Sequence, residues 1–206
     1  MYETSVEEVI ATPVLAQIGG SGHALHGMGR EDVDARMLGR GRPFILEVKE
    51  PRHRSVVLGD VAATVNRTGS VEVEGLRMAS GAEVVGLKED RARKTYRVLV
   101  RFAGSVEGGK LKLAAASLAS RPIGQRTPAR VSHRRADRTR ERLVTAIEVT
   151  RLDSATAELR ITAEAGTYVK ELMHGDRGRT TPSLAEALGI ACDVVELDVL
   201  EIEDKG

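Results

Sequence analysis

Apolar and polar residues alternate along much of this chain, as they do in strands that bury one face. The alternation is clearest in "KTYRVLVRFAG", and "RLVTAIEVTRLDSATAELRITAEAG" holds two such runs around the turn "LDSA", a pattern typical of a hairpin. The same criterion predicts further strands, with the strand at 82–90 pairing with 94–104 through the turn "EDRAR". The remaining predicted strands cover residues 43–51, 70–78 and 192–203.

Helix signals lie between these runs. A short helix is expected around Ser5 to Ile10, followed by a glycine-rich loop, "GGSGHALHG". A second helix over 58–69 takes Asp60 as its N-cap, because a short acidic side chain can accept the first free backbone N–H groups. The other predicted helices cover residues 110–120, 167–175, and 181–190, where Thr181 is the N-cap, Pro182 the first helical residue and Gly189 the end.

Strands outnumber helices and do not alternate with them one by one. This order favours an α+β fold with a mixed, largely antiparallel sheet flanked by helices. No long Pro/Ser linker divides the chain. We therefore expect one continuous sheet and one domain over residues 1–206.

The composition limits the protein class. With 206 residues and 41% hydrophobic content the chain can build a core, and its aromatic residues are only three Tyr and two Phe. The single cysteine, Cys192, excludes an internal disulfide and a cysteine zinc site. There is no run of eighteen apolar residues, and "MYETSVEEVI" lacks a signal-peptide pattern, so the sequence predicts a cytoplasmic protein.

The charge is unevenly distributed. The whole chain carries +1, but the segment from Arg121 to Arg142 contains eight arginines against Asp137 and Glu141. Such a run is usually a solvated face. Arginine without lysine, however, suits bidentate contacts with phosphate, so structured RNA is the expected partner and binding should depend on salt.

Three acids gather between glycines in "HGMGREDVDARMLGRGRPF", His26 to Phe44. Composition alone favours a charged surface turn. The alternative is a loop that presents a carboxylate into a cleft, and the apolar spacing of "VDARML" indicates that the loop is anchored to a core.

Tyr96 and Lys170 are each open to two interpretations. A lone tyrosine in a strand is usually core packing, but in an RNA enzyme it can stack on a base. Lys170 lies just after Gly166, where a helix begins. A cation is disfavoured at that end of the helix dipole unless an acid lies opposite it.

Four blocks together carry a resemblance to a known family: "GREDVDARMLGRGRPF", "KTYRVLV", "QRTPARVSHRRADRTR" and "GTYVKELMHGDRGRTTPSL". In this order they resemble the archaeal and eukaryotic tRNA pseudouridine-54/55 synthase family over nearly the whole chain. More distantly, "GRED" is similar to the "GRTD" loop of TruA-type synthases and "GTYVKEL" to the "GTYIRSL" block of TruB-type synthases. The resemblance implies the pseudouridine synthase core, with a catalytic cleft across its sheet.

The resemblance also implies roles for individual residues. Asp32 would be the catalytic aspartate, and Glu31 and Asp34 would support its loop. Tyr96 would stack on the target base, and Lys170 would pair with the aspartate. Residues implied or expected to contact RNA are Arg30, which would hold the flipped nucleotide out of the stack, and Arg126, Arg130, His133, Arg134, Arg135 and Arg138 of the arginine run.

The implied reaction isomerises uridine in the T-loop of tRNA at position 54, position 55 or both. It needs neither a cofactor nor a metal, because the base is only detached, turned and rejoined through C5. The uridine must first be flipped out of the folded tRNA. A nucleophilic and a glycal route both remain open.

Family members usually carry an N-terminal accessory region with a zinc site and an RNA-binding domain. We expect a stand-alone catalytic domain or a truncated product, with a separate RNA-binding partner as one substitute for that region. Two other hypotheses remain: a non-catalytic RNA-binding module and, less favoured, a DNA-binding protein. No membrane association is expected.

Overall fold

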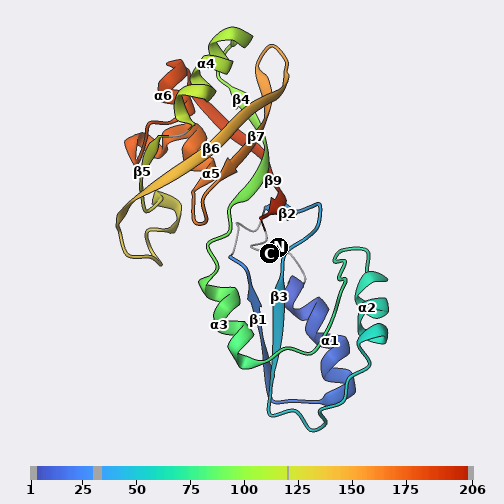
Figure 1. Ribbon diagram of the computed structural model, residues 1–206. Coiled ribbons are helices and arrows are strands. Elements are labelled where there is room, and N and C mark those ends of the chain that lie inside the picture. The colour runs from blue at the N-terminus through green and yellow to red at the C-terminus, as the bar shows by residue number, and fades with distance from the viewer. Residues whose placement is uncertain (1–3, 30–33, 120, 204–206) are drawn as a thin grey trace. The chain divides into compact units, whose positions relative to one another are not determined.

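The structure, a computed structural model, describes residues 4–29, 34–119 and 121–203 (Figure 1). The chain divides into two compact units: unit 1 consists of Met1–Arg30 and Pro43–Asp90, and unit 2 of Glu31–Arg42 and Arg91–Gly206. The expectation of one continuous sheet is wrong, because unit 1 has a two-stranded sheet and unit 2 a seven-stranded one. Among the described residues, no helix is long and apolar enough to cross a membrane.

Unit 1 is a hairpin-like pair of strands with three helices. The strands pair antiparallel from Gly22 against Lys49 to Gly27 against Phe44. A small core of Ile10, Val61, Val65 and Val73 forms beside them. The elements are α1 (Val6–Ile18), β1 (Gly22–Gly27), β3 (Phe44–Lys49), α2 (Leu58–Asn66) and α3 (Gly81–Glu89).

Unit 2 contains the large sheet, whose strand order is β2-β9-β4-β7-β6-β5-β8. Only the β2–β9 pair is parallel, and the other neighbours are antiparallel. The predicted α+β class with a mixed, largely antiparallel sheet is therefore confirmed. The strands are β2 (Ala35–Met37), β4 (Lys94–Phe102), β5 (Pro122–Arg126), β6 (Thr139–Leu152), β7 (Thr156–Ala163), β8 (Thr180–Thr181) and β9 (Cys192–Ile202).

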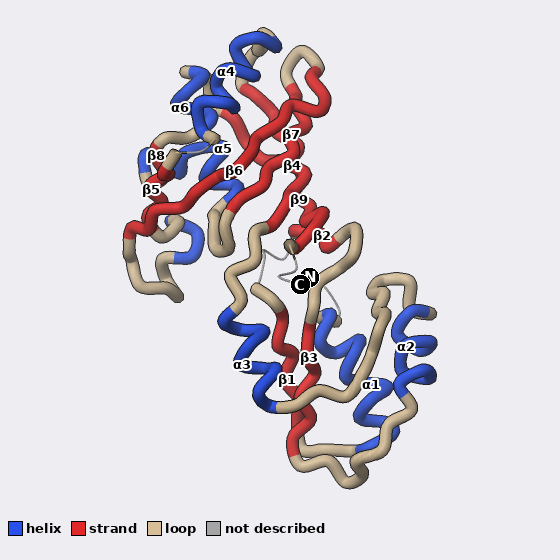
Figure 2. Tube along the Cα trace, viewed as in Figure 1, coloured by secondary structure: helices blue, strands red, loops and turns tan. Residues whose placement is uncertain are grey.

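Helices gather along this sheet, as the blue segments among the red strands of unit 2 show (Figure 2). Helix α4 packs on β6, α5 packs on β9, and both contact α6. The helices are α4 (Gly108–Leu118), α5 (Val169–His174) and α6 (Leu184–Leu188), with the 3-10 turns η1 (Ala129–Val131) and η2 (Gly175–Gly178).

The two faces of the large sheet differ because side chains alternate along each strand. On one face, Tyr96, Val98 and Val100 of β4 lie in the core with Leu159 of β7. The opposite face carries ion pairs centred on Asp198, whose side chain is 1% exposed and which binds Arg36 at 2.8 Å and Arg97 at 2.5 Å. Burial of this carboxylate is tolerated because two guanidinium groups pair with it.

Most of the predicted elements of unit 2 are confirmed. The strands β4 and β9, the β6–β7 hairpin and the helices α4, α5 and α6 all form where the patterns placed them. Gly189 ends α6 in the left-handed conformation, as expected. The predicted N-cap Thr181 is wrong, because Ser183 accepts the Glu186 backbone N–H instead, and Pro182 precedes the helix.

Unit 1 departs more from the expectations. The segment 82–90 belongs to helix α3 and not to a strand, because the Glu83 carboxylate accepts the Ser80 backbone N–H at 2.8 Å and so starts a helix. Residues 70–78 form no strand either: the Asn66 side chain bonds both backbone groups of Val73, at 2.8 and 3.1 Å, in place of a neighbouring strand.

Three smaller corrections also fall in unit 1. Helix α1 continues to Ile18, well beyond the expected Ile10. Part of the expected glycine-rich loop forms strand β1. This strand pairs along its whole length with the apolar strand β3. Helix α2 forms as predicted, but its N-cap is Val57, and Asp60 lies within its first turn.

Candidate active site

The acidic stretch joins the large sheet through β2. Asp32, Arg30 and Glu31 lie outside the described residues, and the description resumes at Asp34, directly before β2. The Leu38 backbone N–H donates to the Val199 carbonyl at 2.8 Å, which fixes the stretch against β9. Gly39 has φ +64°, and a Cβ at this position would clash with the Leu200 carbonyl. The stretch is thus anchored to a core, as its apolar spacing indicated.

Lys170 lies in the first turn of α5 and has an acid opposite it. Its ammonium donates to both carboxylate oxygens of Asp34, at 2.7 and 2.6 Å. The side chain of Lys170 is 19% exposed and that of Asp34 is 66% exposed. The hydrogen bond from Lys170 holds the pKa of Asp34 below its usual value, although partial burial opposes this. The contact between Asp32 and Lys170 stays a prediction.

Tyr96 is part of the core and also faces charged groups. It lies on β4 with 4% exposure, and burial raises its pKa to about 12, so its hydroxyl keeps its proton at neutral pH. It pairs across the sheet with Val199 of β9, which in turn pairs with Met37 of β2. Tyr96 also shares one buried cluster with Val169, the neighbour of Lys170. The elements that carry Asp34, Tyr96 and Lys170 therefore meet within unit 2.

Two cations near Tyr96, Lys94 and Arg42, were not predicted from the sequence. Lys94 lies two positions before Tyr96 on β4 and is 5% exposed. Burial, and to a smaller degree the nearby Arg42 charge, lower the pKa of Lys94 to about 8. Burial also lowers the pKa of Arg42, whereas the neighbouring Tyr96 acts to raise it. The available signal was the spacing of Lys94 and Tyr96, which places both side chains on the same face of a strand.

Two of the arginines assigned to RNA binding pair with acids of unit 2. Arg126 contacts Asp137 at 2.5 Å, and Asp137 also binds Arg179 at 2.7 Å. Arg130 contacts Glu171 at 2.7 Å, and the Glu171 side chain is only 1% exposed. An RNA role for Arg126 and Arg130 stays a prediction.

The other basic residues assigned to RNA binding within the run lie between η1 and β6 and are exposed. Arg135 donates to the Tyr168 hydroxyl at 3.4 Å. His133, Arg134 and Arg138 are exposed, and their side chains form no ion pair with any described residue. We call residues 132–138 the arginine tip. Contact of this part of the run with a phosphate backbone stays a prediction.

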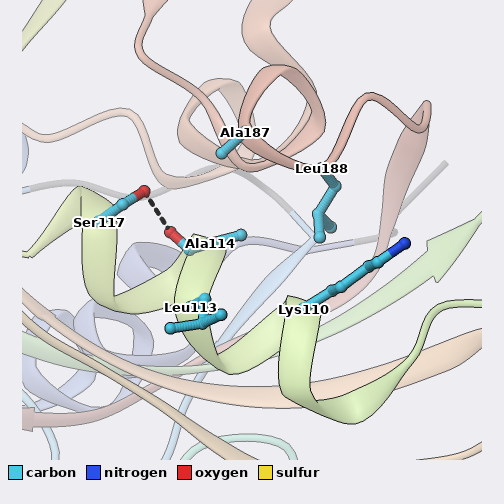
Figure 3. Close-up of a pocket in the computed structure, with 6 residues that line it drawn as sticks. All are labelled: Lys110, Leu113, Ala114, Ser117, Ala187 and Leu188. Carbon is cyan, nitrogen blue, oxygen red and sulfur yellow. Dashed lines mark hydrogen bonds between the residues drawn. The ribbon is translucent and has the colours of Figure 1, made fainter.

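A surface hollow between α4 and α6 is a separate feature (Figure 3). Its volume is about 320 Å³, and its lining is largely aliphatic, with the Lys110 ammonium as its charged group. None of the predicted site residues that the structure describes lines it, so we do not treat it as the candidate site. The lining residues are Lys110, Leu113, Ala114, Ser117, Ala187 and Leu188.

Comparison with protein families gives one match over residues 1–203, to the family described as "Pus10, C-terminal". Among curated proteins, the chain is 46% identical over 207 residues to the tRNA pseudouridine synthase Pus10 of Methanothrix thermoacetophila, covering 98% of this chain and 45% of that protein. It is 51% identical over 207 residues to the Pus10 enzyme of Methanothermobacter marburgensis, covering 98% and 50%. The chain thus spans about half the length of these relatives.

Solved structures agree on the fold. A Cbf5-Nop10-Gar1 complex contains a chain similar to this one with a TM-score of 0.60 and 21% identity, covering 97% of this chain and 45% of that chain. A Nop10-Cbf5 complex of an archaeal box H/ACA particle gives a TM-score of 0.52 and 18% identity, covering 95% and 43%. At these identities the likeness concerns the fold alone.

Proposed function

Because this chain belongs to the Pus10 C-terminal family, we propose that it is the catalytic part of a tRNA pseudouridine synthase that acts on uridine in the T-loop. We propose that residues 1–206 work as one catalytic domain, with tRNA as the substrate and the cytoplasm as the compartment. The relatives are about twice as long as this chain. Activity at position 54, position 55 or both is therefore part of the proposal.

The observation that carries this proposal is the ion pair between Lys170 and Asp34. It holds the acidic stretch against the first turn of α5, two residues along the chain from Asp32. A cation at that place favours ionised carboxylates. Asp32 therefore serves as the catalytic carboxylate in our proposal, and Lys170 keeps it charged.

The proposed reaction needs few parts. The bond from C1′ of the ribose to N1 of the base breaks, a bond from C1′ to C5 forms, and the proton on C5 is finally replaced by one on N1. An ionised carboxylate can attack C1′ or assist departure of the base, and both routes fit an aspartate. Tyr96 stacks on the base, and its raised pKa keeps the hydroxyl neutral.

RNA binding is assigned to the exposed cations. The arginine tip supplies phosphate contacts, and Arg30 helps to hold the flipped uridine. Flipping a stacked base costs a few kcal/mol, which contacts to the surrounding backbone can offset. A separate RNA-binding partner is a further part of the proposal.

The decisive experiment incubates the purified protein with an unmodified tRNA transcript and locates pseudouridine by carbodiimide mapping. We expect product in the T-loop and none with Asp32→Asn, while tRNA binding persists. Asp153→Asn is the matched control, because Asp153 lies in the β6–β7 turn, where it pairs with Arg151. Full activity of Asp32→Asn would overturn the assignment of the catalytic residue.

A second function is favoured by the exposed arginine tip: RNA binding without catalysis. Under that hypothesis, the wild type binds tRNA in a salt-dependent manner and forms no pseudouridine. Competition by duplex DNA separates a general affinity for nucleic acid from recognition of tRNA. The same preparation and the same salt series test both functions.

A further inference from the structure

Arg130 differs from the arginines of the tip in what it contacts. Its Nε donates to one oxygen of Glu171 at 2.7 Å, and its Nη2 donates to the other at 3.4 Å. Glu171 is 1% exposed, whereas the Arg130 side chain is 37% exposed. A phosphate that drew Arg130 away would leave a buried carboxylate without this partner, which is unfavourable.

Glu171 directly follows Lys170 in the first turn of α5. Neighbouring residues of a helix point in different directions, so one turn faces two partners. Lys170 reaches Asp34, and Glu171 reaches Arg130. Arg130 is also close enough to Asp34 for its charge to act on that carboxylate.

The segment around Arg130 is tied to the same part of unit 2 at further points. The buried Gln125 side chain bonds the backbone N–H and carbonyl of Tyr168, at 2.8 and 2.9 Å. The Ala129 backbone N–H donates to Asp176 at 2.8 Å, and the Arg179 Nε donates to the Thr127 carbonyl at 3.0 Å. Residues 125–130, the base of the arginine run, and the α5–η2 segment are thus joined into one assembly, to which the tip is attached through Asp137.

We propose that Arg130 is a positioning residue, whose pair with Glu171 links the RNA-contacting arginine tip to the helix turn that presents Lys170. When RNA contacts the tip, the pair keeps the α5 turn in register with the acidic stretch. Arg130 then contributes to the rate of the bound complex more than to affinity. This inference rests on the proposed function, because it concerns the same reaction.

The test measures single-turnover rates at saturating enzyme and, separately, the Kd for tRNA. For Arg130→Met we expect the rate to fall roughly 10- to 100-fold, because a small misplacement of catalytic groups is costly, while Kd changes less than about threefold. Arg130→Lys should recover part of the rate, since an ammonium can still pair with Glu171. For Arg134→Ala at the tip we expect the opposite signature, a weaker Kd and a salt slope reduced by about one.

Arg151→Met is the matched control, because the exposed Arg151, near the end of β6, pairs with Asp153 of the β6–β7 turn and belongs to no proposed site. If Arg130→Met folds poorly, the double variant Arg130→Met/Glu171→Gln removes both charges together. We expect its single-turnover rate to fall roughly 10- to 100-fold below that of the wild type, because the link is lost in this variant as well.

The outcomes separate the two proposals. Weaker tRNA binding with a retained saturated rate in Arg130→Met would make Arg130 an RNA contact and overturn the inference. A retained rate in the double variant would overturn it as well. Absence of pseudouridine from the wild type itself would instead defeat the proposed function, and the inference with it.

Discussion

The two units differ in how much apolar structure supports them. The main core of unit 2 contains twenty-one buried residues on a seven-stranded sheet, whereas that of unit 1 contains four beside a two-stranded sheet, among the residues described. A two-stranded sheet is marginal without packing partners. The larger unit can therefore accommodate buried charges such as Lys94 and Glu171, each of which costs stability. This difference explains why the charged residues of the candidate site lie in unit 2.

The largest expected effect is in amide hydrogen exchange. Exchange of a protected amide requires opening, and the free energy of opening follows local packing. We expect amides at the centre of β4 and β7 to exchange at least about 100-fold more slowly than those of α2 and β1. Exchange followed by mass spectrometry of peptides measures this directly. Equal protection in both units would mean that they open together and that the size of the local core does not set the protection.

The second expected effect is a pH dependence confined to unit 2. The pKa of Lys94 is about 8 in the folded protein, against an ordinary value of 10.5. Between these values the unfolded chain holds more protons, so the free energy of unfolding increases as pH rises through this window. Over the whole window, the free energy of unfolding should increase by roughly 3 kcal/mol.

Chemical denaturation of wild type and Lys94→Met between pH 7 and pH 10 measures this gain. The variant should lack the increase, whereas Lys112→Met, a change at an exposed lysine of α4, should keep it. Ionisation of Tyr96 and Cys192 is common to all three proteins and cancels in the difference. Parallel pH profiles for wild type and Lys94→Met would contradict the burial of a low-pKa lysine.

The same contrast explains which parts of the fold could be predicted from sequence. In unit 2, strands such as β4 and β7 bury alternate residues in a large core, so the period of the pattern matches the structure. In unit 1, α3 has no buried residue and its apolar pattern carried no helical period. Its helical signal was the pair Ser80 and Glu83, which the pattern of apolar residues does not register.

The candidate site was predictable to a similar degree. The position of Lys170 in a helix start required an acid opposite it, and the structure supplies Asp34. The pairing of Arg130 with Glu171 could not be foreseen, because it joins residues 41 positions apart that meet only once the arginine run is attached to α5. Its charge alone predicted that Arg130 contacts RNA. The fold distinguishes Arg130 from the arginines of the tip, because it pairs Arg130 with the buried Glu171.

A matched pair of core substitutions tests whether each core supports its own unit. Val98 of β4 and Val65 of α2 are both 0% exposed, so each change to alanine removes the same two buried methyl groups. We expect a cost of about 2 kcal/mol at either site. Val98→Ala should lower protection throughout unit 2, whereas Val65→Ala should lower it in unit 1 alone. Loss of protection in both units from Val65→Ala would show that the small core supports the whole chain.

The smallest expected effect tests the start of α3. In Ser80→Ala the hydroxyl that contacts the Glu83 carboxylate at 3.0 Å is lost, while the backbone N–H of residue 80 still donates to it. Loss of an N-cap side chain typically destabilises a helix modestly, so amides of α3 should exchange about fivefold faster, with unit 2 unaffected. Ser55→Ala, at an exposed position outside any helix or strand, is the control. If the amides of α3 exchange at the wild-type rate, packing of the helix against β1 stabilises it, although α3 has no buried residue.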